Sequence, residues 1–211
     1  MVKAESSLSC LQLIGGHVAL DFANSIHCRS VENPCDLIPS YGAMVEWSAV
    51  AGILSSEQAV FLQQEGAARA LEAERVLERA LVLRQAVHEV FSSVAASRVP
   101  ATAALAELNA ELSGALCRRS VQHDGTRMLW GWQGSDAALD QMLWTLATAA
   151  ADLLTSEDVQ WIRECQASDC DRLFLDTSRN RRRQWCSMQW CGNREKARRS
   201  ARNKRQFSDD V

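Results

Sequence analysis

Four cysteines crowd into 27 residues near the end of this 211-residue chain, and they constrain its fold more than any other feature. Cys165 and Cys170 form one C-x4-C pair, and Cys186 and Cys191 form a second pair after fifteen residues. Two such pairs can surround one tetrahedral ion with four thiolates, and zinc is the metal that this ligand set favours. We therefore expect one structural Zn²⁺ in a closed site made of four cysteines.

The charge of the chain is divided at about the same place. The whole chain has 23 Lys and Arg against 26 Asp and Glu, a net charge of −3. Residues 1–160 contain 10 cations and 19 acidic groups, whereas residues 161–207 contain 13 cations and 5 acidic groups. A basic tail on an acidic body predicts an anionic partner, most often nucleic acid. The alternative is that the tail docks on its own acidic body.

Length and composition are typical of a soluble protein with one sizeable core. Hydrophobic residues make up 47% of the chain and charged residues 23%. No run of about 18 apolar residues is present, and residues 1–7 lack a basic segment followed by an apolar stretch. We therefore expect a cytoplasmic, nucleoid-associated protein that does not insert into a membrane.

The hydrophobic periodicity predicts a mostly helical body. Leu11 to Ile14 and His17 to Phe22, joined by Gly15-Gly16, predict a β-hairpin, and residues 120–132 predict a second one around Asp124-Gly125. Apolar residues that recur at intervals of three and four predict the helices. These helices span residues 41–54, a segment starting at Ser56, and residues 67–97, 101–116 and 135–154.

The tail has a pattern of its own. Residues 159–163 and 173–175 are expected to be strands around the first Cys pair, and a basic loop follows over residues 176–183. A helix is expected from Gly192 to about Gln206. Its seven cations leave little room for a buried stripe, so it requires an anionic surface. The cations are Arg194, Lys196, Arg198, Arg199, Arg202, Lys204 and Arg205.

Two segments resemble known families. Cys165-x4-Cys170-x3-Phe174-x-Asp176, followed by Trp185-Cys186-Ser187-Met188-x2-Cys191-Gly192-Asn193-Arg194-x-Lys196, resembles the CGNR zinc finger. The segment from Gly16 to Ser25, with Trp47 further on, is similar to the ABATE domain that precedes this finger in bacterial proteins described as regulators of transcription under stress. The resemblance implies zinc bound by the four cysteines, DNA binding through the finger, and an N-terminal domain that senses a ligand or partner. Gln184 departs from the family pattern, which usually has Arg there.

The expected fold class is therefore α+β. A mostly helical N-terminal domain with two short β-hairpins, residues 1–158, precedes a small four-cysteine zinc-finger domain that ends in a basic helix, residues 159–211. Phe174 and Trp185 are expected to pack over the metal. Asp176 either accepts a hydrogen bond from Arg179 or Arg194 or caps the basic loop.

Two sets of residues are candidates for binding. The candidate DNA contacts carry positive charge or an amide that can reach phosphates and base edges: Arg179, Arg182, Arg183, Asn193, Arg194, Lys196 and Arg199. The candidate lining of a small-molecule pocket is Asp21, Asn24, Trp47, Trp130 and Trp132. The role of Cys28 and Cys35 stays open: with His27 they could form a redox or metal pair, but no C-x-x-C spacing or further ligand accompanies them.

Three functional hypotheses follow. The leading one is a zinc-containing regulator of transcription that binds double-stranded DNA, with a homodimer as one arrangement that the sequence allows. The alternative is an RNA-binding or protein-interaction module whose finger is purely structural. An enzyme is not expected, because no catalytic triad motif, phosphate loop, dinucleotide fingerprint or catalytic zinc set is present.

Overall fold

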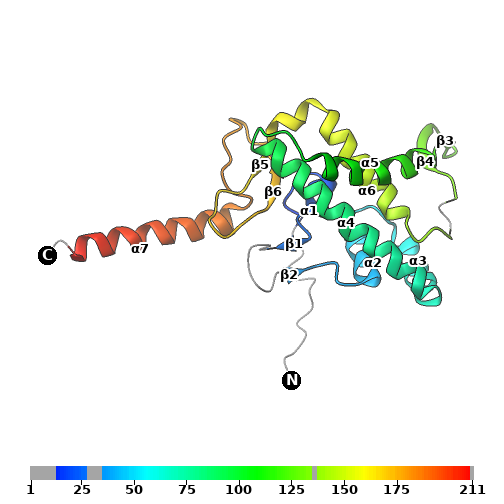
Figure 1. Cartoon of the computed structure of the whole chain (residues 1–211), viewed down its shortest axis with the longest axis horizontal. Helices are drawn as coiled ribbons and strands as arrows, with labels where there is room; N and C mark the ends of the chain where they lie inside the picture. Colours follow the sequence, from blue (N-terminus) through cyan, green and yellow to red (C-terminus); the bar gives the residue numbers. More distant parts are fainter. Residues whose placement is uncertain (1–12, 28–34, 135–136, 210–211) are drawn as a thin grey trace, which may run out of the picture.

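The computed structural model describes residues 13–27, 35–134 and 137–209, with side chains for all of these except 27 and 203–209. It is mostly helical, with three short antiparallel strand pairs. Figure 1 shows a helical body from which the last helix, α7, extends as a separate arm. The predicted α+β class is confirmed. None of the described helices is long and apolar enough to cross a membrane.

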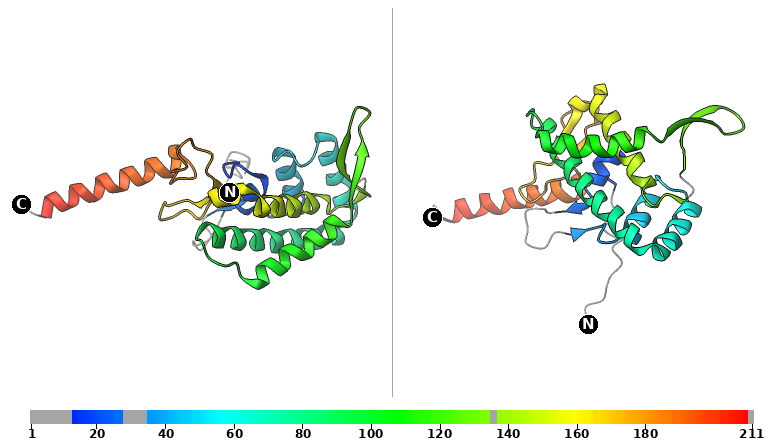
Figure 2. Two further views of the ribbon diagram at one scale, coloured as in Figure 1. Left: turned by 90° about the horizontal axis from the view of Figure 1, so that it is seen from above. Right: turned by 45° about the vertical axis from the view of Figure 1, so that its right-hand side comes forward.

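The body is built around the small helix α1, Val18–Ala23, which lies between the longer helices α4, Ala70–Ala95, and α6, Gln141–Thr155. Helix α5, Thr102–Leu116, packs on α4 and α6. Helices α2, Tyr41–Val50, and α3, Ser56–Ala68, pack on one another and on α4. Figures 1 and 2 show that the long α4 runs across the whole body.

The predicted hairpin over residues 11–22 is wrong, because Val18–Ala23 is a helix. Gly16 turns the chain with a φ of +73°, and the His17 side chain accepts a hydrogen bond from the Ala19 N–H, which caps the helix. Residues 19–23 are all buried. A helix that is buried on nearly every side belongs inside a core, and so short a run can also be interpreted as an alternating strand. Residues 11 and 12 lie outside the described residues.

The other helices lie close to their predicted positions. The long helical pattern from residue 67 is interrupted at Arg69, where the backbone leaves helical geometry. Ser55, rather than Ser56, caps α3, and it forms a reciprocal capping box with Gln58. Helix α6 begins at Gln141, later than predicted, and Ser135 lies outside the described residues.

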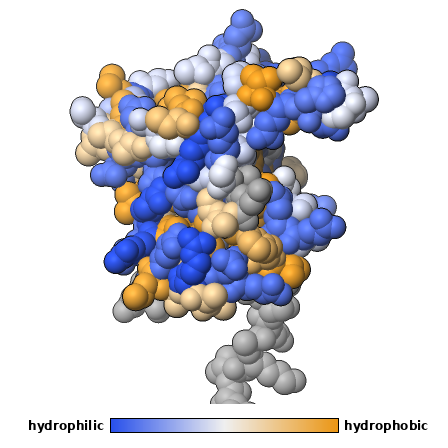
Figure 3. Space-filling model, turned by 90° about the vertical axis from the view of Figure 1, so that its right-hand side faces the viewer, coloured by the Kyte–Doolittle hydropathy of each residue, from blue (hydrophilic) through white to orange (hydrophobic). Residues whose placement is uncertain are grey.

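Two strand pairs belong to the body. Strands β1, Ile26–His27, and β2, Cys35–Asp36, form a short pair whose Asp36 carboxylate accepts a hydrogen bond of 2.6 Å from the buried Arg84 guanidinium. Strands β3, Arg119–His123, and β4, Met128–Trp132, form the second predicted hairpin, in register with Val121 opposite Trp130. This hairpin projects at the end of the body that is remote from α7 (Figure 2). On that end, hydrophilic and hydrophobic side chains are interspersed in small patches (Figure 3).

The C-terminal part begins with a short 3-10 helix, η3, Glu157–Trp161, where the sequence had predicted a strand. Strands β5, Ile162–Glu164, and β6, Leu173–Leu175, pair next, then come a π-helical turn, η4, Met188–Gly192, and helix α7, Asn193–Asp209. The hairpin β5–β6 is shared by two cores. Ile162, Leu173 and Leu175 belong to the main core, whereas Phe174, on the opposite face of β6, belongs to a small core with the cysteines.

Candidate metal centre and nucleic-acid interface

The first cysteine pair is positioned by the β5–β6 hairpin. Cys165 follows β5, and its N–H donates to the carbonyl of Arg172 at 2.9 Å. The Cys170 N–H donates to the carbonyl of Ala167 at 3.0 Å, which tightens the turn between the two strands. Both sulfurs therefore lie at the end of the hairpin, on the side of β6 that carries Phe174.

The second pair is positioned by the turn that leads into α7. Cys186 precedes η4 and Cys191 lies inside it, with Ser187 capping the turn through a 3.4 Å hydrogen bond from the Trp190 N–H. Gly192 permits close packing here, because a Cβ at this position would lie 2.5 Å from the Met188 Sδ and 3.0 Å from Trp185 Cδ1. A larger residue would require the Met188 or Trp185 side chain to move.

The four sulfurs meet at one point. The Sγ atoms of Cys165, Cys170, Cys186 and Cys191 all lie within 4.8 Å of one another. Cys186 Sγ is 3.7 Å from Cys170 Sγ and 3.5 Å from Cys191 Sγ. A tetrahedral zinc with Zn–S bonds of about 2.3 Å requires sulfur separations of about 3.8 Å. The two separations from Cys186 are close to this value, and none exceeds it by more than about 1 Å. The predicted site for one structural metal ion is confirmed.

Hydrogen bonds within the cluster change the pKa values of its thiols. The pKa of Cys165 is lowered because its sulfur accepts hydrogen bonds from the thiols of Cys170 and Cys186 and from backbone N–H groups, including that of Cys186 at 3.4 Å. The pKa values of Cys170 and Cys186 are raised, chiefly by the same interaction with Cys165. Four thiolates this close together repel one another, so a divalent cation is what allows all four to ionise together.

Aromatic and cationic side chains complete this small core. Phe174 and Trp185 pack against the cysteines, as predicted. The Arg183 guanidinium lies 4.4 Å above the centre of the Phe174 ring and donates to the carbonyls of Trp185, at 2.8 Å, and Cys186. Arg183 was predicted to contact DNA, but these bonds direct its guanidinium inward, where it stabilises the second cysteine loop.

The carboxylate of Asp176 organises the basic loop. It is fully buried and accepts hydrogen bonds from the Ser178 N–H at 3.0 Å, the Ser178 hydroxyl at 2.6 Å and the Arg183 N–H at 2.9 Å. Burial raises the pKa of Asp176, but these hydrogen bonds outweigh it and the pKa lies below its ordinary value. Of the two predicted roles, Asp176 therefore has the capping role. Its carboxylate binds neither Arg179 nor Arg194.

A network of ion pairs fixes the start of α7 to the first cysteine loop. Asp169 accepts hydrogen bonds from Arg194 at 2.6 Å and from Arg198 at 2.7 Å. Arg198 also donates to Glu195 at 2.6 Å, and Arg194 lies 3.5 Å from Cys191 Sγ. The hydrogen bonds from Arg198 lower the pKa values of Asp169 and Glu195. The positive charges of Arg194 and Arg198 on this side of α7 are therefore neutralised by acidic groups of the finger itself.

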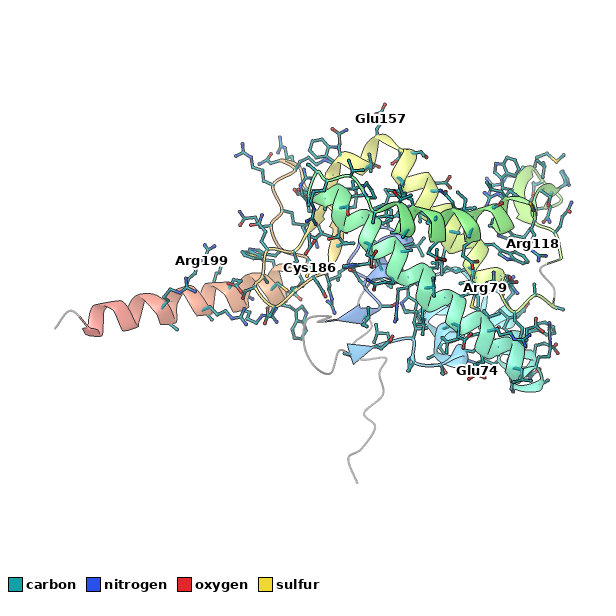
Figure 4. The ribbon with its side chains drawn as sticks, in the orientation of Figure 1. Glu74, Arg79, Arg118, Glu157, Cys186 and Arg199 are labelled. Carbon is teal, nitrogen blue, oxygen red and sulfur yellow. The ribbon has the colours of Figure 1, made fainter. Side chains whose placement is uncertain are left out.

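Other cations of this region face solvent. Among the described side chains of residues 162–202, five exposed cations take part in no hydrogen bond or ion pair: Arg179, Arg182, Lys196, Arg199 and Arg202. Figure 4 shows Arg199 projecting from α7 away from the body. Asn193 is exposed at the first turn, and its amide donates to the Gln189 carbonyl at 3.1 Å. Of the seven predicted DNA contacts, five are thus accessible, Arg194 is ion-paired and Arg183 is directed inward.

Comparison with known proteins agrees with this architecture. The ABATE family model, described as "Putative stress-induced transcription regulator", matches residues 16–157. The chain belongs to the ABATE family. The model of the CGNR zinc finger matches residues 162–205, the segment that contains all four cysteines. No curated protein matches the chain.

The residues predicted to line a ligand pocket in the ABATE domain do not meet in one place. Trp47 is buried in the core, with its ring 5.7 Å from that of Phe22. Trp132 packs against Trp144 at the base of the β3–β4 hairpin, and Trp130 is 62% exposed on that hairpin. Asp21 and Asn24 lie instead on the buried α1 and at its end.

Asp21 and Asn24 attach the CGNR finger to the ABATE domain. The Asn24 side chain forms two hydrogen bonds with the backbone of Leu173 in β6. Asp21 accepts a 2.7 Å hydrogen bond from the Gly15 N–H, and the Gly15 carbonyl accepts a 2.7 Å bond from the Leu175 N–H. Both polar residues were predicted to line a ligand pocket, and their role in holding β6 was not predicted. No sequence signal linked them to β6.

Proposed function

We propose that this ABATE protein is a regulator of transcription whose CGNR finger binds double-stranded DNA. The observation that carries the proposal is the row of exposed, unpaired cations on a helix that stands away from the body and is anchored at a zinc site. An α-helix with its side chains is about 10–12 Å wide, which matches the major groove of B-form DNA.

The two sides of α7 support separate roles. Arg194 and Arg198 are neutralised by Asp169 and Glu195, so they orient the helix. Lys196, Arg199 and Arg202 remain free for phosphates, and Arg179 and Arg182 in the preceding loop extend the positive surface. Each phosphate neutralised releases counterions, so binding is expected to weaken steeply as salt rises.

In this proposal the ABATE domain receives a signal from a small molecule. A hollow of about 470 Å³ among α4, α5 and α6 is the candidate site for a charged ligand. Arg79 lies there between Glu111 and Asp140, and Arg118 stacks 4.6 Å from the centre of the Trp144 ring. Figure 4 shows Arg79 and Arg118 at the same end of the body. If a ligand raises the melting temperature of the wild type but not that of Arg79→Ala, this hollow is the binding site of that ligand.

We propose that the protein binds DNA as a homodimer, because one small finger reads only about 3 base pairs in the best-known finger class. The proposal includes no enzymatic activity. We further propose that the protein is bacterial and acts in the cytoplasm, at the nucleoid, in a stress response. The family description and the proposed DNA binding support this.

The test is fluorescence anisotropy of the zinc-loaded protein on labelled duplex DNA across a salt series, with a zinc-stripped control and an RNA competitor. Tight binding that requires zinc and weakens with salt is the expected result. Preferential binding to the RNA, or no binding at low salt, would favour the alternative of an RNA-binding or protein-interaction module with a structural finger.

A further inference from the structure

The turn between Cys186 and Cys191 exposes two large apolar side chains on the finger. Met188 is 53% exposed and Trp190 is 59% exposed. Tryptophan is highly buried on average, so an exposed one on a small, highly charged module requires an explanation. Packing around the metal does not supply it, because Trp185 and Phe174 already form that small core.

The backbone that carries Trp190 is held in place by the turn. Cys186 and Cys191, on either side of it, belong to the metal site, and Ser187 fixes the turn by accepting from the Trp190 N–H and, through its carbonyl, from the Gly192 N–H at 3.1 Å. A rigid aromatic side chain loses little conformational entropy when it binds a partner.

The surroundings of Trp190 are cationic and amide-rich. Trp190 lies in η4, and the exposed Asn193 and Lys196 follow it in the first turn of α7. Next to Met188 lies a hollow of about 310 Å³, lined also by Arg182 and Gln184. The acidic groups of this region, Asp169 and Glu195, are already paired with Arg194 and Arg198. The exposed Trp190 ring among unpaired cations and amides suits a partner that combines phosphates with aromatic faces, as nucleic acid does.

We propose that Trp190 stacks on an unstacked nucleobase, so that the finger binds duplex DNA preferentially where a base step is opened. This inference rests on the proposed function and names the DNA structure that the finger prefers. In regular B-form DNA the faces of the bases are covered by their neighbours, and only their edges are accessible in the grooves. An apolar side chain such as Trp190 must therefore open a base step before it can stack, which costs a few kcal/mol. DNA in which the step is already distorted avoids this cost.

The experiment compares three labelled DNAs of one sequence: a fully paired duplex, the same duplex with a one-base bulge, and the single strand. The full-length, zinc-loaded protein is measured beside Trp190→Ala, Trp190→Leu and Trp190→Phe. Trp130→Ala is the matched control, because Trp130 is 62% exposed but lies on the β3–β4 hairpin, remote from α7. Zinc content and far-UV circular dichroism verify that each variant is folded.

The wild type is expected to bind the bulged duplex most tightly. Trp190→Ala and Trp190→Leu should weaken that binding by about 5- to 100-fold, since base–aromatic stacking is of this size. Trp190→Phe should retain most of it and Trp130→Ala all of it, and the salt dependence should be the same for all variants because no charge changes. A 2-aminopurine at the bulge should be quenched by the wild type and not by Trp190→Ala.

Two results would overturn the inference while leaving the proposed function intact. One is salt-sensitive duplex binding that Trp190→Ala does not weaken. The other is equally tight binding of the wild type to the bulged and the fully paired duplex. Tightest binding to the single strand would instead overturn both the inference and the proposed binding of double-stranded DNA. Failure of the wild type to bind any of the three DNAs would instead overturn the proposed function itself.

Discussion

The side-chain amide of Asn24 hydrogen-bonds to both backbone groups of Leu173. Its Nδ2 donates to the Leu173 carbonyl at 2.7 Å, and its Oδ1 accepts from the Leu173 N–H at 2.8 Å. The two residues are 149 positions apart, and both are buried. The amide thus takes the place of a neighbouring strand along β6 and joins the end of α1 to the finger. A change in the position of α1 would move the hairpin that carries Cys165 and Cys170.

Replacing Asn24 by Ala is expected to lower the free energy of unfolding by about 2–4 kcal/mol, because it leaves a buried N–H and a buried carbonyl of Leu173 without partners. Urea denaturation measures this loss, and hydrogen exchange at the Leu173 amide reports its location. Asn193→Ala is the matched control, since Asn193 is exposed and its removal should change stability little. An unchanged urea midpoint for Asn24→Ala would contradict the structural role.

The stability of the ABATE domain is expected to depend on the ionisation of Asp21. Burial raises the pKa of Asp21 to about 6, and hydrogen bonds from the N–H groups of Gly15 and Ile14 and the charge of Arg172 only partly oppose it. The ordinary value in an unfolded chain is 3.8. Between these two values the folded state binds the proton and the unfolded state does not, so stability falls as the pH rises from about 4 to 6 and then levels off.

Urea denaturation of the wild type and of Asp21→Asn at several pH values tests this dependence. Relative to the variant, the wild type should lose roughly 1–3 kcal/mol between pH 4 and pH 7. Protonation of the zinc ligands at low pH affects both proteins equally, so the difference between the two isolates Asp21. A difference that does not change with pH would show that Asp21 ionises normally in the folded protein.

Local sequence patterns predicted the parts of this fold that depend on local interactions. Residues at intervals of three and four located α2, α4 and α5 to within a few positions, and the Asp124-Gly125 turn located the β3–β4 hairpin. The cysteine spacing predicted the metal cluster because the four ligands lie in one short segment. Helix α1 was mistaken for a strand because all of its faces are buried, which removes the polar positions that reveal a period of 3.6.

Sequence did not predict how the individual polar side chains of the site are oriented. Arg183 and Arg182 are adjacent and chemically identical, yet one binds the carbonyls of Trp185 and Cys186 and the other faces solvent. Composition reveals the positive charge of a segment but not which guanidinium groups have internal partners. The pairing of Asn24 with Leu173 was equally invisible, because it joins segments that only the folded core brings together.

Removal of zinc is expected to unfold only part of the finger. The cluster core around Cys186, Trp185 and Phe174 is small and depends on the metal, whereas Ile162, Leu173 and Leu175 pack in the main core. After chelation, hydrogen exchange should accelerate over residues 176–193 while the β5–β6 amides stay protected. DNA binding should be lost, and readdition of zinc should restore it. Equal loss of protection in β5–β6 would show that the hairpin also depends on the metal.

Arg194 and Lys196 are two residues apart in α7 but have different surroundings. Lys196 takes part in no ion pair, so Lys196→Ala should weaken binding to every duplex sequence equally and reduce the slope of log K against log salt by about one. The zinc content and the protection of α7 from hydrogen exchange should not change. Arg194 is bound to Asp169, so Arg194→Ala should weaken binding by loosening α7, and hydrogen exchange over the first turns of α7 should accelerate.

Asp169→Asn separates positioning by Arg194 from direct contact with phosphate. If the Asp169–Arg194–Arg198 network orients α7, removing the acceptor charge loosens the helix, and binding weakens although the finger has become more positive. If Arg194 instead contacts phosphate directly, releasing it from Asp169 strengthens binding. Anisotropy at several salt concentrations, with Lys196→Ala as the reference for one lost phosphate contact, distinguishes the two. Stronger binding by Asp169→Asn would contradict the positioning role.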